Sequence, residues 1–271
     1  MAAPVYALGS DVEERQRLQR QSAELRPLSV SLLDHVGVQA GQSALDLGCG
    51  PLGVIDLLSE RVGPNGHVVG MDLNPANVAL ARSFVHDHGL ANTTIVEGDA
   101  RHTGLDDSSF DVVHARTLLI NIPDPGVVVT EMKRLVRPGG WVAVMDPDMA
   151  VQLYHPHNPA WDRLHEIFML AFQIDGADPF IGRRLPEILR AAGLTDIGVE
   201  ARVDLYPLGH SRRTIRVDLV RSMRAKIVAK GIAGEKELDD LDRAARKHLA
   251  DPFTLVLPGC YFMAWGRKAA S

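Results

Sequence analysis

The chain has 271 residues, 46% of them hydrophobic, so it can bury one large core, either as a single domain or as a core with a lid. Its formal net charge of −5 argues against a nucleic-acid partner, which normally requires a basic domain or stripe, and its two cysteines give neither a disulfide framework nor the spacing of a metal site. No apolar run reaches the roughly 18 residues that span a bilayer, and the N-terminus has no signal-peptide pattern, so we expect a soluble, cytoplasmic protein without a membrane partner.

The chain begins with a segment, 1–36, that is expected to be helical. Ser10 and Glu13 make a capping-box pattern ahead of a helix over 11–25, and residues 28–36 continue as a second amphipathic stretch. We expect this segment to precede the sheet and to serve as a lid.

The first strand ends in a glycine-rich turn that carries an acid. Residues 43–53 read S-A-L-D-L-G-C-G-P-L-G, and the glycines Gly48, Gly50 and Gly53 alone fit the dinucleotide fingerprint. The carboxylate of Asp46 would repel a pyrophosphate there, but would attract a ligand with an ammonium and a sulfonium group. This is the charge pattern of the amino-acid end of S-adenosylmethionine, which we therefore expect as the cofactor.

Short apolar runs then alternate with helical patterns. Asp72 ends the second run about 20 residues after the glycine turn, where an acid accepts hydrogen bonds from ribose hydroxyls. Asp99 ends the third run and is a candidate acceptor for an adenine amino group. The alternation predicts an α/β fold with a parallel sheet covered by helices on both faces. The expected later strands are 68–72, 94–100, 110–115, 141–146, 197–205 and 262–266, and the expected helices are 53–61, 75–88, 127–135 and 184–192.

Five signatures in this order resemble those of class I S-adenosylmethionine-dependent methyltransferases. They are D-L-G-C-G at 46–50, M-D-L at 71–73, E-G-D-A at 97–100, F-D-V-V at 110–113 and R-P-G-G at 137–140. The resemblance covers nearly the whole chain and is closest to the branch that holds the ubiquinone and menaquinone C-methyltransferases and many methyltransferases of secondary metabolism. It implies a Rossmann-like sheet of seven strands, mostly parallel, whose last strand runs antiparallel and is inserted as an edge hairpin partner. Family members usually have Thr-Gly after the Gly-x-Gly, whereas this chain has Pro51 and Leu52.

The resemblance also implies which residues hold the cofactor. Asp46 and the turn at Gly48 and Gly50 would cradle the methionine part, Asp72 the ribose, and Asp99 the adenine edge. An aromatic residue and a glutamine near the N-terminus close over the cofactor in related enzymes, although a solvated surface helix is the alternative here. A structural salt bridge is the alternative for Arg116, which follows the fourth strand. The remaining cofactor candidates are Tyr6, Gln21, Leu73, Asn77, Gly98, Ala100 and Arg116.

Two stretches exceed what the sheet needs, and we expect them to form a helical cap over the methyl-donor pocket. The first, 154–180, carries apolar residues at helical spacing, and the second, 207–252, carries two such patterns. Ordinary packing faces are the alternative for these apolar stripes. The expected organisation is a lid (1–36), a cofactor-binding core (37–153, 181–206 and 253–271) and two cap insertions.

Histidines at the mouths of the insertions are candidate general bases, because histidine has a suitable unperturbed pKa for a hydroxyl or amine acceptor. His155 and His210 are the leading candidates, and a hydrogen-bonded loop residue is the alternative for each. Asp146 and Asp148 end the fifth strand, where one of them is a candidate substrate contact. The alternatives are a buried loop acceptor for Asp146 and a cap of the following segment for Asp148.

These observations favour a methyltransferase that acts at O, N or C of a small, largely apolar metabolite, in secondary-metabolite biosynthesis. A cyclase or pericyclase of the same fold would carry the same cofactor motifs. A protein or RNA methyltransferase would need a basic groove; the one local basic cluster, Arg212, Arg213, Arg216, Arg221 and Arg224, is expected to be a solvated helix face. The sequence indicates no oligomeric state.

Overall fold

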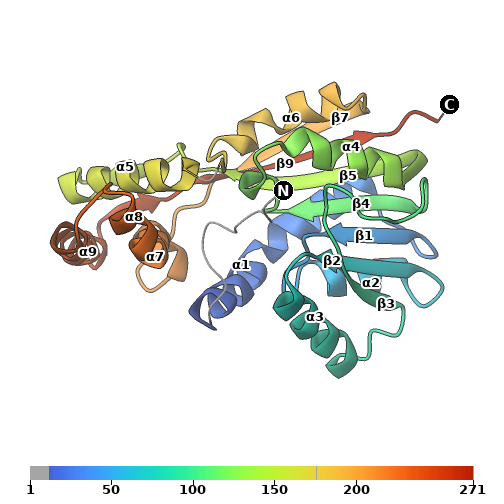
Figure 1. Ribbon diagram of the computed structural model, residues 1–271, viewed down its shortest axis with the longest axis horizontal. Coiled ribbons are helices and arrows are strands. Elements are labelled where there is room, and N and C mark those ends of the chain that lie inside the picture. Colours follow the sequence, from blue (N-terminus) through green and yellow to red (C-terminus); the bar gives the residue numbers. More distant parts are fainter. Residues whose placement is uncertain (1–11, 175, 271) are drawn as a thin grey trace.

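The computed structural model describes residues 12–174 and 176–270 (Figure 1). The strands are β1 (Ser43–Leu47), β2 (His67–Asp72), β3 (Thr93–Glu97), β4 (Phe110–Arg116), β5 (Val136–Asp148), β6 (Leu153–His155), β7 (Thr195–Arg202), β8 (Leu255–Leu257) and β9 (Cys260–Arg267). The helices are α1 (Val12–Val36), α2 (Ile55–Val62), α3 (Pro75–Asp87), α4 (Pro125–Leu135), α5 (Pro159–Gln173), α6 (Ile181–Ala191), α7 (Ile215–Ser222), α8 (Arg224–Ala229) and α9 (Glu235–Leu249), with the short 3₁₀ helices η1 (Leu119–Asn121) and η2 (Ser211–Thr214).

A seven-stranded sheet forms the centre of the molecule. Its order is β3-β2-β1-β4-β5-β9-β7, and β9 runs antiparallel to both of its neighbours while the remaining pairs are parallel. This topology confirms the Rossmann-like sheet with an antiparallel last strand. The last strand is inserted as the partner of the edge strand, because β9 lies between β5 and β7 and leaves β7 outermost.

Two elements are longer than the sequence predicts. The fifth strand, expected over 141–146, begins at Val136 and takes in the R-P-G-G stretch as a bulge opposite Phe110 and Val112. Helix α1 runs unbroken through Pro27, because the buried leucines on both sides of the proline pack against the sheet and outweigh one lost backbone hydrogen bond. Ser10 of the expected capping box lies outside the described residues.

Alternating strand residues divide the core between the two faces of the sheet. Leu45 and Leu47 of β1 belong to a cluster that includes α4 and α6, whereas Ala44 belongs to the cluster beneath α1, α2 and α3. Figure 1 shows these two sets of helices on opposite sides of the sheet. The helices therefore cover both faces, as the βαβ alternation predicts.

The two insertions meet as one helical cap beyond the carboxyl ends of the parallel strands (Figure 1). Helix α5 of the first insertion packs against α7, α8 and α9 of the second, and β6 pairs with β8 as a separate small sheet that joins them. The first helical pattern of the second insertion is divided in two, because α7 ends at Ser222 and Met223 separates it from α8.

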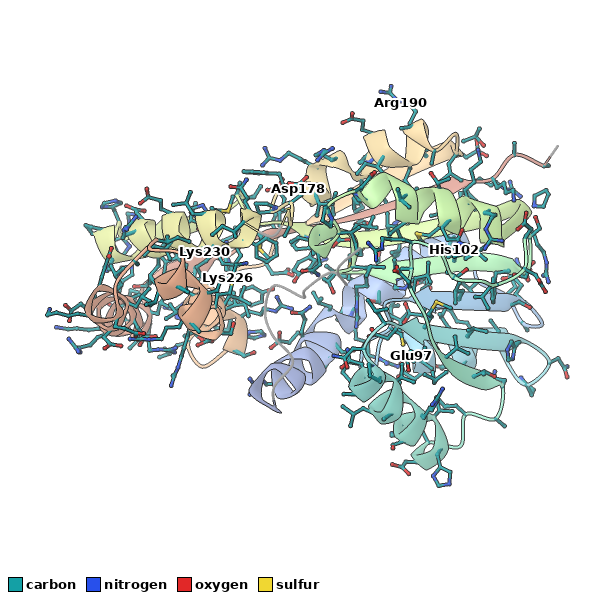
Figure 2. The ribbon with its side chains drawn as sticks, in the orientation of Figure 1. Glu97, His102, Asp178, Arg190, Lys226 and Lys230 are labelled. Carbon is teal, nitrogen blue, oxygen red and sulfur yellow. The ribbon has the colours of Figure 1, made fainter. Side chains whose placement is uncertain are left out.

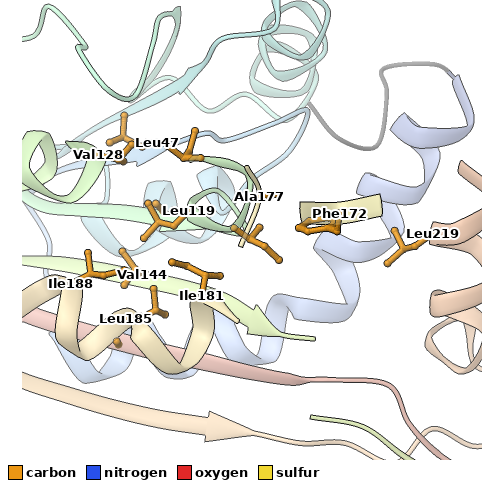
Figure 3. Close-up of a cluster of buried hydrophobic side chains, with 14 of the residues drawn as sticks. Leu47, Leu119, Val128, Val144, Phe172, Ala177, Ile181, Leu185, Ile188 and Leu219 are labelled. Atoms are coloured by element: carbon orange, nitrogen blue, oxygen red, sulfur yellow. The ribbon is translucent and has the colours of Figure 1, made fainter. Parts of the chain in front are cut away.

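The cap and the sheet share one apolar cluster. Figure 3 shows it running from Leu47 and Val144 in the sheet, past Ala177, to Phe172 and Leu219 in the cap. Continuous burial of this kind fixes the cap on the sheet near the ends of β4 and β5. Within the described ranges, no helix is long and apolar enough to cross a membrane.

Candidate active site

A cleft opens at the carboxyl ends of β1 and β4, where the strand order changes direction. Open α/β sheets bind their ligands at this switch point. Five predicted cofactor residues line the cleft together: Gln21, Asp46, Gly48, Gly50 and Arg116. Ser22, Thr117 and the rest of the glycine turn complete the lining. Ser22 and Thr117 were not predicted from the sequence, and Tyr6 lies outside the described residues.

The glycine turn has a backbone that requires glycine. Gly48, Gly50 and Gly53 have φ angles of 66°, 58° and 52°, in the left-handed region. A Cβ on Gly48 would come within 2.8 Å of the Leu118 side chain, and a Cβ on Gly53 would collide with the Asp46 carboxylate. Around Gly50, by contrast, no atom lies within 4 Å of a Cβ position. The turn therefore leaves open backbone at Gly50, which a ligand can approach closely.

Asp46 forms the floor of the cleft and is 1% exposed. Its Oδ2 accepts a hydrogen bond from the Val54 amide at 3.0 Å, and its Oδ1 is hydrogen-bonded to Nδ1 of His114 at 2.7 Å. His114 is fully buried, and its Nε2 has no hydrogen-bond partner in the described part of the chain. His114 was not predicted as a site residue, although a histidine within an apolar strand is a signal for a buried polar contact.

Arg116 links helix α1 to the glycine turn. Its guanidinium donates to Oγ of Ser29 at 3.0 Å, to Oγ of Ser22 at 2.9 Å and to the carbonyl of Gly53 at 3.0 Å. Burial lowers the pKa of Arg116, and the nearby Asp46 carboxylate opposes that shift. Its contacts are with hydroxyls and a carbonyl rather than with the carboxylate of a salt bridge, so it positions α1 against the cleft.

Asp72 holds the other side of the glycine turn. Its Oδ2 accepts from the Gly50 amide at 2.8 Å, and its Oδ1 accepts from the Asn74 amide at 2.9 Å and from Nδ2 of Asn77 at 3.2 Å. Leu73 follows with 44% of its side chain exposed. The predicted residues Asp72, Leu73 and Asn77 thus lie together, with the carboxylate fixed by three donors.

Asp99 is already engaged by a residue that the sequence analysis missed. Both of its oxygens accept from the Arg101 guanidinium, at distances from 2.6 to 3.1 Å, and this hydrogen bonding lowers the pKa of Asp99. A Cβ on Gly98 would come within 2.8 Å of the Met71 sulfur, and Ala100 packs against the apolar cluster. The loop after β3 is therefore close-packed, with the Asp99 carboxylate held by a neighbouring cation.

The candidate bases do not line the cleft at the glycine turn. His155 is exposed on β6. Nδ1 of His210 accepts from the Arg212 amide at 3.1 Å, and its ring lies 4.6 Å from that of Tyr206. The alternative of a hydrogen-bonded loop residue fits His210.

The two acids at the end of β5 are loop acceptors. Asp146 is fully buried and accepts from the amides of Ile120, at 3.1 Å, and Leu119, at 3.3 Å, while burial raises its pKa to about 8. Asp148 accepts from the Ala150 amide at 3.0 Å and pairs with Arg183. These contacts fit a buried loop acceptor at Asp146 and a cap of the following segment at Asp148.

The expectation of a solvated basic helix face is wrong for three of its five arginines. Arg212, Arg213 and Arg216 are only 5%, 3% and 1% exposed, because η2 packs against α9 and α7 packs against α5 within the cap. Cap cations such as Lys226 and Lys230 lie well away from the sheet side, where Glu97 and His102 are found (Figure 2). The cluster therefore forms no continuous basic groove of the kind that a protein or RNA substrate would need.

Comparison with known proteins identifies sequence relatives. A family model described as a methyltransferase domain matches residues 39–191. A demethylmenaquinone methyltransferase from a Geobacillus species is 31% identical over 198 residues, which cover 66% of this chain and 83% of that protein. A demethylmenaquinone methyltransferase from Listeria welshimeri is 32% identical over 131 residues, which cover 48% of this chain and 53% of that protein.

Solved structures share the fold at lower identity. Phosphoethanolamine N-methyltransferase 2 from Haemonchus contortus, in complex with phosphomonomethylethanolamine and S-adenosylhomocysteine, superposes with a TM-score of 0.57 at 21% identity, covering 89% of this chain and 52% of that one. The 4+2 cyclase SpnF gives a TM-score of 0.56 at 18% identity, covering 90% of this chain and 81% of that one. At these identities the superpositions establish a common fold.

Proposed function

Since the chain belongs to the class I S-adenosylmethionine-dependent methyltransferases, we propose that it transfers a methyl group from S-adenosylmethionine to a small, largely apolar acceptor. One observation carries this proposal: the cleft at the switch point joins the open glycine turn to the Asp46 carboxylate, with Asp72 at its side. This arrangement suits a ligand that brings positive charge and a ribose into one site.

Each part of the cleft has a role in holding the cofactor. Asp46 would face the positively charged amino-acid end, with His114 and the Val54 amide keeping its carboxylate in place. Asp72 would accept from the ribose, and the exposed side chain of Leu73 would cover the adenine. Arg101 already donates to both oxygens of Asp99. The adenine amino group would therefore donate to the lone pairs of Asp99 that Arg101 leaves free.

The chain itself contributes orientation and the exclusion of water. When bound, the cofactor supplies a methyl group that its sulfonium already activates. Arg116 and Ser22 hold α1 over the glycine turn, and the cap helices cover the carboxyl ends of the strands, so an acceptor is enclosed beside the cleft. His155 and His210 remain proposed bases, but the exposure of the one and the loop contacts of the other give them little support.

The acceptor class is proposed from the cap and the relatives. The apolar cap cluster, with α5 and α7 against the ends of the strands, favours a largely apolar molecule. The names of the Geobacillus and Listeria relatives support an apolar ring compound, with methylation at carbon as one option beside oxygen and nitrogen. A role in secondary metabolism and a cytoplasmic location are part of this proposal.

A non-methylating cyclase is the second candidate. The likeness to SpnF supports it at the level of the fold. The two candidates differ in product, because a methyltransferase converts its cofactor to S-adenosylhomocysteine and adds 14 mass units to the acceptor, roughly one CH₂ group, whereas a cyclase leaves both masses unchanged.

The test is a thermal-shift titration of the purified protein with S-adenosylmethionine, S-adenosylhomocysteine and NAD. A ligand at about 100 times its dissociation constant stabilises a protein by roughly 2.7 kcal/mol. We expect the first two to raise the melting temperature and NAD to leave it unchanged. A shift with NAD, or none with S-adenosylhomocysteine, would contradict the proposal. Acceptor screening by mass spectrometry then separates the methyltransferase from the cyclase.

A further inference from the structure

We infer that the acceptor carries an anionic oxygen group, a carboxylate or a phenolate, and that Arg216 and Arg212 bind it at the base of the cap. The inference rests on the proposed function, because it assigns a chemical class to the acceptor of the same enzyme.

The proposed anion site is a small cavity between the ends of β5 and β9 and the start of α7. Arg212 and Arg216 line it from the cap side, and Pro147 and Tyr261 line it from the sheet. Its volume of about 20 Å³ has room for one water, so only one compact group of an acceptor enters without movement of the cap. Pro147 and Tyr261 are register partners on β5 and β9, which places the cavity at the edge of the sheet where ligands bind.

Arg216 is a buried cation without a carboxylate partner among the described residues. Its Nη2 donates to the carbonyls of Met149, at 3.0 Å, and Pro258, at 3.1 Å, and its guanidinium lies 4.1 Å from the centre of the Phe168 ring. Its Nε and Nη1 have no hydrogen-bond partner in the part of the chain that the structure describes. A buried charge with free donors is costly unless a ligand of opposite charge completes it.

The neighbouring polar groups do not compensate for this charge. The Tyr154 hydroxyl lies beside Arg216 without a hydrogen bond of good geometry, and burial raises its pKa, so it stays neutral. Burial and the charge of Arg216 lower the pKa of His165 to about 4, and Nδ1 of His165 also lacks a partner within the described residues. An anion in the cavity would gain donors from Arg216, and neither Tyr154 nor His165 adds a negative charge beside that cation.

Arg212 connects the anion site to the cofactor cleft. Its Nε pairs with Oε2 of Glu24 at 2.6 Å, and its Nη1 donates to the Tyr261 hydroxyl at 2.9 Å, which leaves Nη2 without a partner among the described residues. Glu24 lies within one turn of Gln21 and Ser22, which line the cofactor cleft on the same helix. An acceptor held by Arg212 and Arg216 therefore extends toward the methyl donor.

Other arginines of the cap have hydrogen-bond or ion-pair partners for their guanidinium groups. Arg213 donates to three backbone carbonyls, and Arg224 pairs with Glu235 and with Asp239. A larger hollow of about 470 Å³ among α5, α7 and α9 is lined by Arg246, which is paired as well. Arg216 differs from these arginines because it is buried and its Nε and Nη1 have no hydrogen-bond partner among the described residues.

The test measures anion binding to the full chain saturated with S-adenosylhomocysteine. The probes are acetate, benzoate, 4-nitrophenolate and inorganic phosphate, and the neutral counterparts are acetamide, benzamide and 4-nitroanisole. We expect benzoate or 4-nitrophenolate to bind about tenfold more tightly than its neutral counterpart, since a charge-assisted hydrogen bond is worth at least that factor. Phosphate is expected to bind more weakly, because the cavity is too small for a tetrahedral dianion.

Three variants identify the site. Arg216→Met is expected to remove the preference for the anion while leaving the affinity for S-adenosylhomocysteine within about twofold, and Arg216→Lys to restore part of it because the charge remains but the planar fork is lost. Arg224→Met, which removes an ion-paired arginine of the cap, is the matched control and should behave as wild type.

Either of two results would overturn the inference: wild-type protein that binds neither anion better than its neutral counterpart, or an anion preference that survives in Arg216→Met. The wild-type comparison decides the matter even if Arg216→Met fails to fold. A failure to bind S-adenosylhomocysteine at all would instead contradict the proposed function.

Discussion

The carboxylate of Asp46 lines the cleft and also accepts hydrogen bonds from buried groups of the protein. It accepts from the Val54 amide and bonds to His114, so a change at this position alters both the glycine turn and the charge offered to a ligand. We expect Asp46→Asn to weaken binding of S-adenosylhomocysteine about tenfold or more, because a hydrogen bond to a charged group is worth roughly 1.5–3 kcal/mol. Isothermal titration calorimetry measures this loss.

The control for that variant is Asp34→Asn. Asp34 is an exposed carboxylate that pairs with Arg61 at 2.6 Å, away from the cleft. The Asp34→Asn variant should bind S-adenosylhomocysteine as tightly as the wild type does. Equal affinities for the Asp46 and Asp34 variants would mean that Asp46 only supports the turn.

Asp146 makes stability depend on pH. Burial raises its pKa to about 8, whereas an aspartate in the unfolded chain has a pKa of about 3.9. Between these two pKa values the folded protein keeps a proton that the unfolded chain has released. The contribution of Asp146 to the free energy of unfolding is therefore fully present below about pH 4 and is lost as the pH rises through about 8. We expect the free energy of unfolding of Asp146→Asn to fall less than that of wild type between pH 5 and pH 8. Urea titrations at several pH values test this, and parallel curves for the two proteins would refute it.

Residues whose role follows from their place after a strand could be found in the sequence. Asp46, Gly50 and Asp72 lie at such positions, and the structure brings them together. His114 was missed because its contact with Asp46 joins two strands 68 residues apart, and burial of Arg216 depends on how α7 packs against the other cap helices. Spacing along the chain records neither of these tertiary contacts.

Among the helices and strands too, local patterns were predictable and tertiary contacts were not. Strand and helix positions in the core follow from hydrophobic periodicity, so the sheet, α2, α3, α4 and α6 were located within a few residues. The β6–β8 pair joins segments about one hundred residues apart, and three-residue strands are too short for a periodic signal. The break between α7 and α8 at Met223 was also hidden, because the apolar pattern continues across it.

Helix α1 and the cap should become less mobile when the cofactor binds. Ser22 and Arg116 link α1 to the glycine turn, and Glu24 links it to Arg212 at the base of the cap. We expect S-adenosylhomocysteine to slow amide hydrogen exchange in α1, α5 and α7, since bound ligand stabilises the elements that close over it. Helix α4, on the opposite face of the sheet, serves as the internal control. Unchanged exchange in α1 and the cap at saturating ligand would count against a closing lid.

At the scale of the whole molecule, the continuous apolar cluster joins the expected core and cap segments into one unit (Figure 3). Trp161 is 1% exposed in the cap beside Tyr154, whereas Trp141 and Trp265 belong to β5 and β9 of the sheet. A variant with both sheet tryptophans changed to phenylalanine would therefore report on the cap by fluorescence, while circular dichroism reports on the whole chain.

We expect the two signals of that variant to follow one transition in urea, because exposing the cap would also expose the sheet residues of the shared cluster. If Trp161 became exposed at a lower urea concentration than the loss of circular dichroism, the cap would be a separate folding unit, and its contacts with the sheet would be worth less than its own internal packing. Coincident transitions would instead mean that Arg216 is held in place by the stability of the whole fold, because its neighbours come from both cap and sheet. The unfavourable burial of its charge would then be offset by the entire shared core rather than by the cap alone.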